Sequence, residues 1–401
     1  TTHGTIFHTG DFKFDAAPLY EPTSDLPRLK ALGDAGVLLA VVGATSATVK
    51  GPSVTETDLA KSLEGYILAR PERRLLVTAA STHIHRFHTL LDIAVKTNRK
   101  VVLMGRSIQQ SCRIGLDQGL LPAALARQII PVEALHQHKP EQLMVFVGGS
   151  QAEPQGTLAR VARGEHRQLA LGPRDTVIWS ARWIPGNEVA VHKVACQLLR
   201  QGAEVMHPHK GDFTHASGHA TADDIKHFFQ LVRPRVVVPV HGEYPQLLET
   251  IRLGQEFGGA TCGQVLDNGQ VLHLAPGQPK VVAETWPTAD VAVEGNRLVL
   301  PNEAYIYRER AQVAEAGHLQ IIVPLGKRQG TPLGEVALNH LGLADPKLWA
   351  DVFTDPQKYL QRQLQQVAQG KKAFDRAAVA EALRQAARRQ LQLEFGKKPL
   401  V

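Results

Sequence analysis

Short apolar runs that alternate with helical segments are the feature that most constrains how this chain folds. Buried strands are predicted at Gly36–Val42, Arg74–Thr78, Lys100–Met104, Leu143–Val147, Asp175–Ser180 and Arg235–Val240. Helical spacing of apolar residues predicts helices between them at Thr57–Leu68, Ile84–Lys96, Glu188–Gln201 and Thr221–Val232. Strands that are apolar along their whole length are typical of parallel sheets covered by helices. The pattern therefore predicts a parallel α/β protein.

The chain changes character after Gly277. A β-rich stretch is expected over Val291–Val323, followed by a helical tail rich in Gln, Arg and Lys over Pro346–Phe395. This change predicts a separate small C-terminal domain. We interpret the net positive helices of the tail as a solvated surface or a dimer contact rather than as a direct contact with nucleic acid.

The composition is that of an ordinary globular protein. The chain has 401 residues, of which 43% are hydrophobic and 21% charged, and this length predicts about two or three domains. Cys112, Cys196 and Cys262 form no CxxC pair, so neither a disulfide framework nor a thiolate zinc site is indicated, and a cytoplasmic location is expected. No stretch approaches the roughly 20 apolar residues of a membrane span. The net charge of +7 fits a polyanionic partner such as RNA without establishing one.

Three short motifs place polar side chains directly after apolar runs, where loops carry chemistry on a rigid scaffold. They are Thr9-Gly10-Asp11, Ser217-Gly218-His219-Ala220 and Val240-His241-Gly242-Glu243. Carboxylate and imidazole ligands at such positions are typical of metal-dependent hydrolases. Two divalent ions about 3.5–4 Å apart would activate a water molecule and stabilise charge on a phosphodiester.

Each motif also has a purely structural interpretation, which stays open. Asp11 is a candidate bridge between two metal ions, or else a turn or helix-capping residue. His241 is a candidate metal ligand or a buried, hydrogen-bonded histidine. Ser217-Gly218-His219 suits a phosphate at the N-terminus of the following helix, or its Ser caps that helix. Glu243 orients an imidazole or caps the next helix. Three further histidines are interpreted as surface residues: His207, His209 and His215.

Several blocks resemble the ribonuclease J family, in the same order along the chain. They are Thr9-Gly10-Asp11-Phe12-Lys13, Gly105-Arg106-Ser107, Gly149-Ser150-Gln151-Ala152-Glu153-Pro154, Ile184-Pro185-Gly186-Asn187-Glu188, Ser217-Gly218-His219-Ala220 and Pro239-Val240-His241-Gly242-Glu243-Tyr244. The resemblance implies an α/β fold with three parts: a metallo-β-lactamase αββα sandwich that lacks its N-terminal part, an inserted beta-CASP parallel α/β domain and a small α+β C-terminal domain. The implied bounds are 1–44 and 207–285 for the metallo-β-lactamase domain, 45–206 for the beta-CASP domain and 286–401 for the C-terminal domain.

The resemblance also implies roles for the motif residues. Asp11 would bind both metal ions and His241 one of them, with Glu243 orienting a ligand. Ser217 and Gly218 would contact the RNA phosphate, and His219 would be the catalytic residue beside the scissile bond. The cofactors would be two divalent ions, of zinc, manganese or magnesium. The partners would be single-stranded RNA and a second copy of the chain or a related subunit, with no membrane.

The segment Ala80–Arg86 resembles the beta-CASP segment that holds the 5′-terminal phosphate of RNA, which implies Ser81 and Arg86 as phosphate-binding residues. The chain departs from the family there by one extra residue, and Ala44 and Ala47 stand where the family has Asp and Asn. No H-x-H-x-D-H metal motif precedes Asp11. Because the chain opens without Met and at once enters a predicted strand, we expect that upstream sequence is missing.

Three functions follow as expectations. The leading one is metal-dependent RNA hydrolysis of the ribonuclease J type, with 5′-to-3′ exonuclease and endonuclease activity in RNA processing and decay. The alternative is a non-catalytic RNA-binding or scaffolding relative, which the absent metal motif favours. The third is a metallo-β-lactamase-type hydrolase that acts on a small ester or a DNA end, which conflicts with the beta-CASP-like blocks. Whether this chain is itself an active enzyme stays open at this point.

Overall fold

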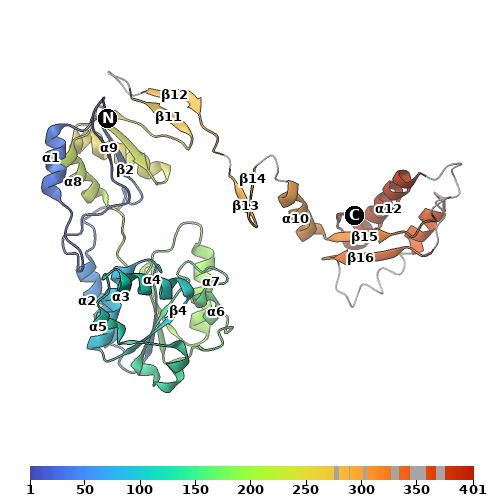
Figure 1. Cartoon of the computed structure of the whole chain (residues 1–401), viewed down its shortest axis with the longest axis horizontal. Coiled ribbons are helices and arrows are strands. Elements are labelled where there is room, and N and C mark those ends of the chain that lie inside the picture. The colour runs from blue at the N-terminus through green and yellow to red at the C-terminus, as the bar shows by residue number, and fades with distance from the viewer. Residues whose placement is uncertain (275–279, 289, 301–304, 327–333, 344–357, 367–374) are drawn as a thin grey trace. The chain divides into compact units, whose positions relative to one another are not determined.

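The structure is a computed structural model that describes residues 1–401 except 275–279, 289, 301–304, 327–333, 344–357 and 367–374, and except the side chains of 280–283. The chain forms two compact units, Thr1–Trp286 and Pro287–Val401. The first unit carries two parallel sheets, a six-stranded one and a four-stranded one (Figure 1). None of the helices within the described ranges is long and apolar enough to cross a membrane.

The six-stranded sheet is parallel throughout, as predicted. Its order is β5-β4-β6-β3-β7-β8, with β3 (Arg74–Thr78), β4 (Lys100–Met104), β5 (Ile129–Ile130), β6 (Leu143–Val147), β7 (Asp175–Trp179) and β8 (Glu204–Met206). β6 is buried at every residue, which is why its sequence is a continuous apolar run. β3, β4 and β6 begin and end at the predicted residues.

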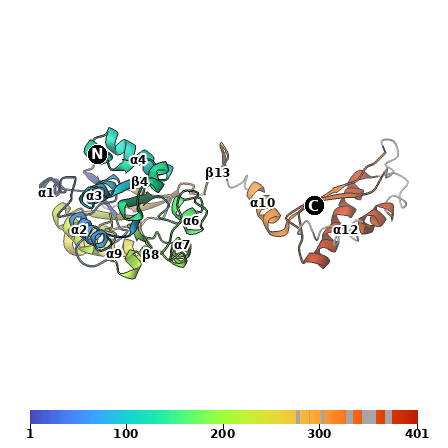
Figure 2. The same ribbon diagram turned by 90° about the horizontal axis from the view of Figure 1, so that it is seen from below.

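Helices cover both faces of this sheet (Figure 1 and Figure 2). One face packs against α2 (Glu56–Leu68), α3 (Ile84–Lys96), α4 (Arg106–Asp117) and α5 (Ala123–Ala126), and the other against α6 (Thr157–Ala162) and α7 (Glu188–Arg200). Successive residues of β3 serve different cores, Leu75 and Val77 the first and Leu76 the second. The parallel α/β prediction is confirmed for this region.

The four-stranded sheet is built from segments on both sides of the six-stranded one in sequence. Its order is β1-β2-β9-β10, all parallel, with β1 (Ile6–His8), β2 (Leu39–Gly43), β9 (Val236–Val240) and β10 (Cys262–Gly263). α1 (Leu26–Ala35), α8 (Ala222–Val232) and α9 (Tyr244–Gly258) contribute to one core around Phe228 and Phe229. α9 lies so close to β9 that a Cβ on Gly254 would stand 2.8 Å from a methyl carbon of Val237.

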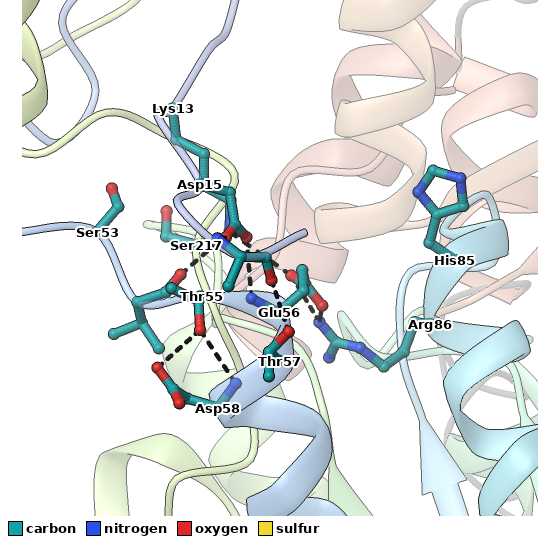
Figure 3. A network of polar contacts seen from close by, with 12 residues as sticks. Lys13, Asp15, Ser53, Thr55, Glu56, Thr57, Asp58, His85, Arg86 and Ser217 are labelled. Carbon is teal, nitrogen blue, oxygen red and sulfur yellow. Dashed lines mark hydrogen bonds and ion pairs between the residues drawn. The ribbon is translucent and has the colours of Figure 1, made fainter. Parts of the chain in front are cut away.

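Polar contacts fasten the segments that connect the two sheets (Figure 3). Asp15, in the loop after β1, accepts from the backbone N–H of Glu56 at 2.9 Å. Asp224, in the first turn of α8, accepts from the hydroxyl of Ser53 and from the backbone N–H of Phe14. The loop after β1, the start of α2 and the start of α8 are therefore held to one another.

Antiparallel pairs and helices follow the second sheet. β11 (Gln270–His273) pairs with β12 (Lys280–Thr285) at the end of the first unit. The second unit holds the pairs β13 (Ala292–Glu294) with β14 (Arg297–Val299) and β15 (His318–Ile322) with β16 (Ala337–Leu341), and the helices α10 (Tyr305–Ala316) and α12 (Arg376–Phe395). Residues 358–366 are helical as well.

The second unit departs from the predicted β-rich stretch and agrees with part of the predicted helical tail. The β-rich prediction for Val291–Val323 is wrong over α10, because the Arg, Glu, Gln and Ala residues of that segment favour a helix. The predicted helical tail Pro346–Phe395 is helical at 358–366 and over α12. Gly277 and the tail residues 346–357 and 367–374 lie outside the described residues.

Candidate active site

One cavity of the first unit collects residues from all three predicted motifs. It has a volume of about 770 Å³, and these motif residues line it: Asp11, Ser217, Gly218, His219, His241, Gly242 and Glu243. They come from the loop after β1, the loop before α8 and the turn between β9 and α9. Parallel strands bring their carboxyl ends to one edge of a sheet, which is why these distant segments meet. We call these residues the motif wall.

Asp11 and His219 lie close together in the motif wall. Oδ1 of Asp11 is 3.7 Å from Nδ1 of His219, and the Asp11 side chain is 58% exposed. The loop that carries Asp11 is fixed by Thr9, whose hydroxyl donates to the carbonyl of Gly10 and accepts the N–H of Gly43 at 3.0 Å. No helix follows Asp11 directly, since α1 begins at residue 26. The carboxylate is therefore available to the cavity rather than engaged as a helix cap.

The Ser217–His219 loop lies shortly before α8, as the sequence predicts. Oγ of Ser217 accepts the backbone N–H of His219 at 3.1 Å, which makes a tight turn within the loop. Thr221, and not Ser217, occupies the N-cap position of α8. The Ser217 side chain thus shapes the loop, and the helix end, with its partial positive charge, follows directly after the cavity residues.

His241 directly follows β9 and has a φ of 55°, an uncommon conformation for a residue with a Cβ and one that recurs at functional sites. Its carbonyl accepts from the hydroxyl of Thr45 at 2.7 Å, which ties the ends of β2 and β9 together. Glu243 holds the N-cap position of α9, and its backbone N–H donates to Oε1 of Gln246 at 2.8 Å. Glu243 thus has the helix-capping position that was one of its two predicted roles.

Ser81 and Arg86 do not line the cavity. Arg86 is fully buried, its Nη2 pairs with both carboxylate oxygens of Glu56 at 2.9 and 3.2 Å, and its Nη1 donates to the hydroxyl of Ser180 (Figure 3). A buried guanidinium is costly unless a carboxylate neutralises it, which Glu56 does here. The prediction that Arg86 binds RNA phosphate directly is therefore corrected: Arg86 stands behind the cavity wall.

Among the cavity residues that the sequence-based site prediction missed are His83, Ser180 and His215. Burial lowers the pKa of His215 and the pKa of His83 to about 4 each, so both rings are neutral at pH 7. The interpretation of His215 as a surface histidine is wrong, because its Nδ1 atom is buried. The sequence signals were weak, since His83 only precedes a predicted helix and Ser180 only ends a predicted strand. Of the other two predicted surface histidines, His209 is exposed and His207 is half-buried.

A carboxylate oxygen and an imidazole nitrogen, such as Asp11 and His241 offer, suit a divalent ion. Within the described ranges, however, no three or more His, Cys, Asp or Glu side chains are grouped closely enough to hold a metal ion. The fully buried Ala44 and Ala47 add no ligand. Zinc sites take three or four protein ligands. The described side chains therefore supply only part of the ligands that a metal site needs.

Comparison with known families matches two consecutive regions of the first unit. The profile of the ribonuclease J beta-CASP domain matches residues 72–198, which run from β3 into α7 of the six-stranded sheet. The profile of the Zn-dependent metallo-hydrolase RNA specificity domain matches residues 206–262, which contain α8, β9 and α9. The second match includes the Ser217–His219 loop and His241.

Curated relatives extend the match along the chain. Ribonuclease J of Sinorhizobium meliloti is 31% identical over 408 residues, which cover 100% of this chain and 70% of the relative. Ribonuclease J of Mycobacterium tuberculosis is 32% identical over 86% of this chain and 62% of the relative. For ribonuclease J of Synechocystis the identity is 31% over 88% of this chain, and the match spans only 54% of the relative.

The comparisons confirm the predicted resemblance and fold class, and none of them supports the non-catalytic alternative. Identity of 31% along the whole of this chain and most of a ribonuclease J carries the assignment. The chain belongs to the ribonuclease J family of metal-dependent ribonucleases.

Proposed function

We propose that the cavity binds single-stranded RNA and that the motif wall takes part in metal-dependent hydrolysis of its phosphodiester bonds. The observation that carries this proposal is the meeting of Asp11, the Ser217–His219 loop and His241 in one cavity. Phosphodiester hydrolysis needs an activated water and stabilisation of charge on the phosphoryl oxygens, to which a carboxylate, imidazoles and a helix N-terminus can contribute.

The motif wall supplies two functions through its own side chains and backbone. The Ser217–Gly218 backbone and the N-terminus of α8 would hold a phosphate. His219 would stabilise charge on the phosphoryl oxygens or donate a proton to the leaving oxygen. Asp11, at 3.7 Å from Nδ1 of His219, can orient that ring. Ser81 remains a candidate contact for the terminal phosphate, with Glu243 a candidate for orienting a metal-bound imidazole.

The finer points of the expected function are proposals as well. Asp11 and His241 would contribute ligands to two divalent ions, of zinc, manganese or magnesium, which supply an activated water and charge stabilisation when bound. Both 5′-to-3′ exonuclease and endonuclease activity are proposed, as are a cytoplasmic location and a homo-oligomer or a pairing with a related subunit. We propose domain bounds of 1–44 and 207–285 for the metallo-β-lactamase domain, 45–206 for the beta-CASP domain and 286–401 for the C-terminal domain.

The first test is a cleavage assay on single-stranded RNA that bears a 5′-monophosphate, in the presence of manganese. The parent chain should release mononucleotides or shorter fragments, and His241→Ala should release neither. The control is His273→Ala, which removes an exposed imidazole of β11. Equal cleavage by the His241→Ala variant would contradict the assignment of His241.

Metal binding by itself provides a second readout. Equilibrium dialysis against manganese should show less bound metal for Asp11→Ala and His241→Ala than for the parent. The variant His219→Ala should bind as much metal as the parent, since its proposed role lies on the phosphate. Unchanged metal content in both ligand variants would contradict the proposed donor set.

A further inference from the structure

A series of charged side chains runs from the loop that carries Asp11 to Ser180 at the end of β7 (Figure 3). Its members are Lys13 and Asp15 of the loop after β1, Glu56 at the start of α2 and Arg86 of α3. We call these four residues the charged link. None of the four lines the cavity, whereas Asp11 and Ser180, which lie next to its two ends, both do.

Lys13 begins the charged link two residues after Asp11. Its neighbours Phe12 and Phe14 pack against the core around Phe228, and the ring centroids of Phe12 and Phe228 are 5.5 Å apart. Nζ of Lys13 lies 3.1 Å from Oδ2 of Asp15 and 3.7 Å from Oε1 of Glu56. The same nitrogen donates to the carbonyl of Val54 at 3.2 Å. Lys13 therefore ties the segment next to Asp11 to the start of α2.

Asp15 makes the same connection a second time. Its carboxylate accepts the backbone N–H of Glu56 and the backbone N–H of Ala17, each at 2.9 Å. The hydroxyl of Thr57 then donates to the carbonyl of Ala17 at 2.7 Å. The side chains of Lys13 and Asp15 are only 13% and 8% exposed, so water and salt screen their attraction less than that of a surface pair.

Glu56 carries the connection on to the cavity. Its two carboxylate oxygens accept from Nη2 of Arg86 at 2.9 and 3.2 Å, and Nη1 of Arg86 donates to the hydroxyl of Ser180. One carboxylate thus contacts two cations: Lys13 from the loop after β1, and Arg86 from a helix that covers the six-stranded sheet. The two sheets contribute one cation each, and Glu56 holds both.

The position of Asp11 depends on its loop, because its own side chain is 58% exposed. Thr9 fixes the loop before Asp11, and the charged link fixes it after Asp11. Geometry matters here, since a displacement of about 1 Å can lower the rate of a reaction about 10²-fold. We propose that Lys13 is a positioning residue: through Asp15 and Glu56 it holds Asp11 in place against the part of the cavity that the six-stranded sheet supplies. This inference rests on the proposed function, because it concerns the geometry of the same reaction.

The test removes the charge of Lys13 and keeps most of its length. Lys13→Met leaves the pair of Glu56 with Arg86 intact, and Asp15 keeps its two backbone donors, so the fold should persist. Single-turnover cleavage of single-stranded RNA with a 5′-monophosphate, in manganese, should be about tenfold slower than in the parent. The dissociation constant for the same RNA, from fluorescence anisotropy in EDTA, should change less than about twofold, since Lys13 does not line the cavity.

Manganese binding without RNA gives a readout that does not depend on cleavage. The signal of free manganese in electron paramagnetic resonance measures how much metal the chain binds. Lys13→Met should bind manganese about tenfold more weakly than the parent, the lower end of the range for loss of a group that orients a metal ligand. Asp11 is the proposed ligand that would lose its fixed position.

Two further variants separate positioning from a general effect of charge. Lys13→Arg keeps a cation in the charged link and should regain most of the parent's cleavage rate and manganese affinity. The matched control is Lys96→Met, which breaks an exposed pair with Glu64 between the same two helices, α3 and α2. The control should leave the cleavage rate, RNA affinity and manganese affinity unchanged.

The possible results separate this inference from the proposed function. Slower cleavage and weaker manganese binding in Lys13→Met, with unchanged RNA affinity and recovery in Lys13→Arg, support it. A parent-like Lys13→Met would overturn it and leave the proposed function intact. Weaker RNA binding in Lys13→Met would also overturn it, because Lys13 would then contact RNA itself, and so would a rate that Lys13→Arg does not recover. A parent that neither binds manganese nor cleaves RNA would contradict the proposed function, and this inference with it.

Discussion

The motif wall and three further cavity residues, His83, Ser180 and His215, which we call the second wall, differ in how their polar groups are held. The motif wall stands on loops at the ends of β1 and β9, where glycines and a left-handed His241 shape the backbone and the Asp11 side chain is 58% exposed. In the second wall Ser180 is buried and accepts from the fully buried guanidinium of Arg86, which Glu56 neutralises, whereas His83 and His215 are half-buried. The first arrangement suits groups that act on a charged phosphate in contact with water. The second suits groups whose positions are fixed by the interior of the protein.

The largest expected effect comes from the motif wall. His219→Ala should lower the rate of RNA cleavage by roughly 10²–10⁴-fold, the range for loss of a general acid or base, and should change RNA affinity little. Single-turnover cleavage together with anisotropy separates the two quantities. If the variant loses affinity for RNA and keeps its cleavage rate, His219 binds RNA without acting on the phosphate. The proposed catalytic role of the motif wall would then fail.

The ion pair of Arg86 with Glu56, behind the second wall, should contribute to the stability of the fold. Arg86→Met leaves Glu56 with only the longer 3.7 Å pair to Lys13 and Ser180 without its donor, and should lower the free energy of unfolding by about 3–5 kcal/mol. Urea unfolding followed by tryptophan fluorescence measures this loss, since the buried Trp179 is the last residue of β7 and directly precedes Ser180. Arg163→Met, which breaks an exposed pair with Glu165, is the matched control and should lower the free energy of unfolding far less than Arg86→Met does. Similar losses in both variants would show that burial does not set the value of the pair.

The two histidines of the second wall should make the stability of the fold depend on pH. The folded-state pKa of His215 is about 4, below its ordinary value of 6.5. As pH falls below 6.5 the unfolded chain takes up a proton that the folded chain refuses, so the contribution of the neutral ring is complete above pH 6.5 and is lost toward pH 4. We expect a loss of about 2 kcal/mol over that range. Unfolding curves at a series of pH values should be flatter for His215→Asn than for the parent or for His273→Asn, and parallel curves would contradict the neutral state.

Two helix glycines give the smallest effect and compare the two sheets. Gly254→Ala places a methyl group 2.8 Å from Val237, so α9 must shift away from β9, at a cost of about 1–3 kcal/mol for overpacking. Gly65→Ala, in α2 beside the six-stranded sheet, meets open space and should stabilise by about 0.5–1 kcal/mol. Thermal unfolding of both variants checks the opposite signs. Two shifts of the same sign would mean that helix propensity outweighs packing.

Much of the fold follows from local sequence because burial imposes it. β3, β4, β6 and α3 occupy the predicted residues, since each lies in a core that rejects polar side chains. α10 did not follow, because three of its first residues, Tyr305, Ile306 and Tyr307, are β-formers and the helix-favouring residues come after them. The residues of this segment favour a strand at its start and a helix further on, and the sequence alone does not decide between the two.

The candidate site divides along the same line as the two walls. Polar residues next to glycine after an apolar run, such as Asp11 and His241, can be recognised from the order of amino acids alone. Ser180 and His83 cannot, because their roles depend on which side chains a buried cation meets. Arg86 finds its carboxylate in Glu56, on a different helix, and no local pattern announces that pairing. The same fact explains why the predicted contact of Arg86 with phosphate needed correction.

β2 and β9 pair directly, from Leu39 with Val236 to Gly43 with Val240, although the whole six-stranded sheet lies between them in sequence. The hydrogen bond between Thr45 and His241 closes the same edge. The chain leaves this sheet after β2 and returns to it through α8, and Ser46 and Thr221, which flank the six-stranded sheet in sequence, form a β-bridge. The inserted six-stranded part could therefore be replaced, in evolution or by design, without altering the register of β2 with β9. The loops that carry Asp11 and His241 would keep their positions on the four-stranded sheet.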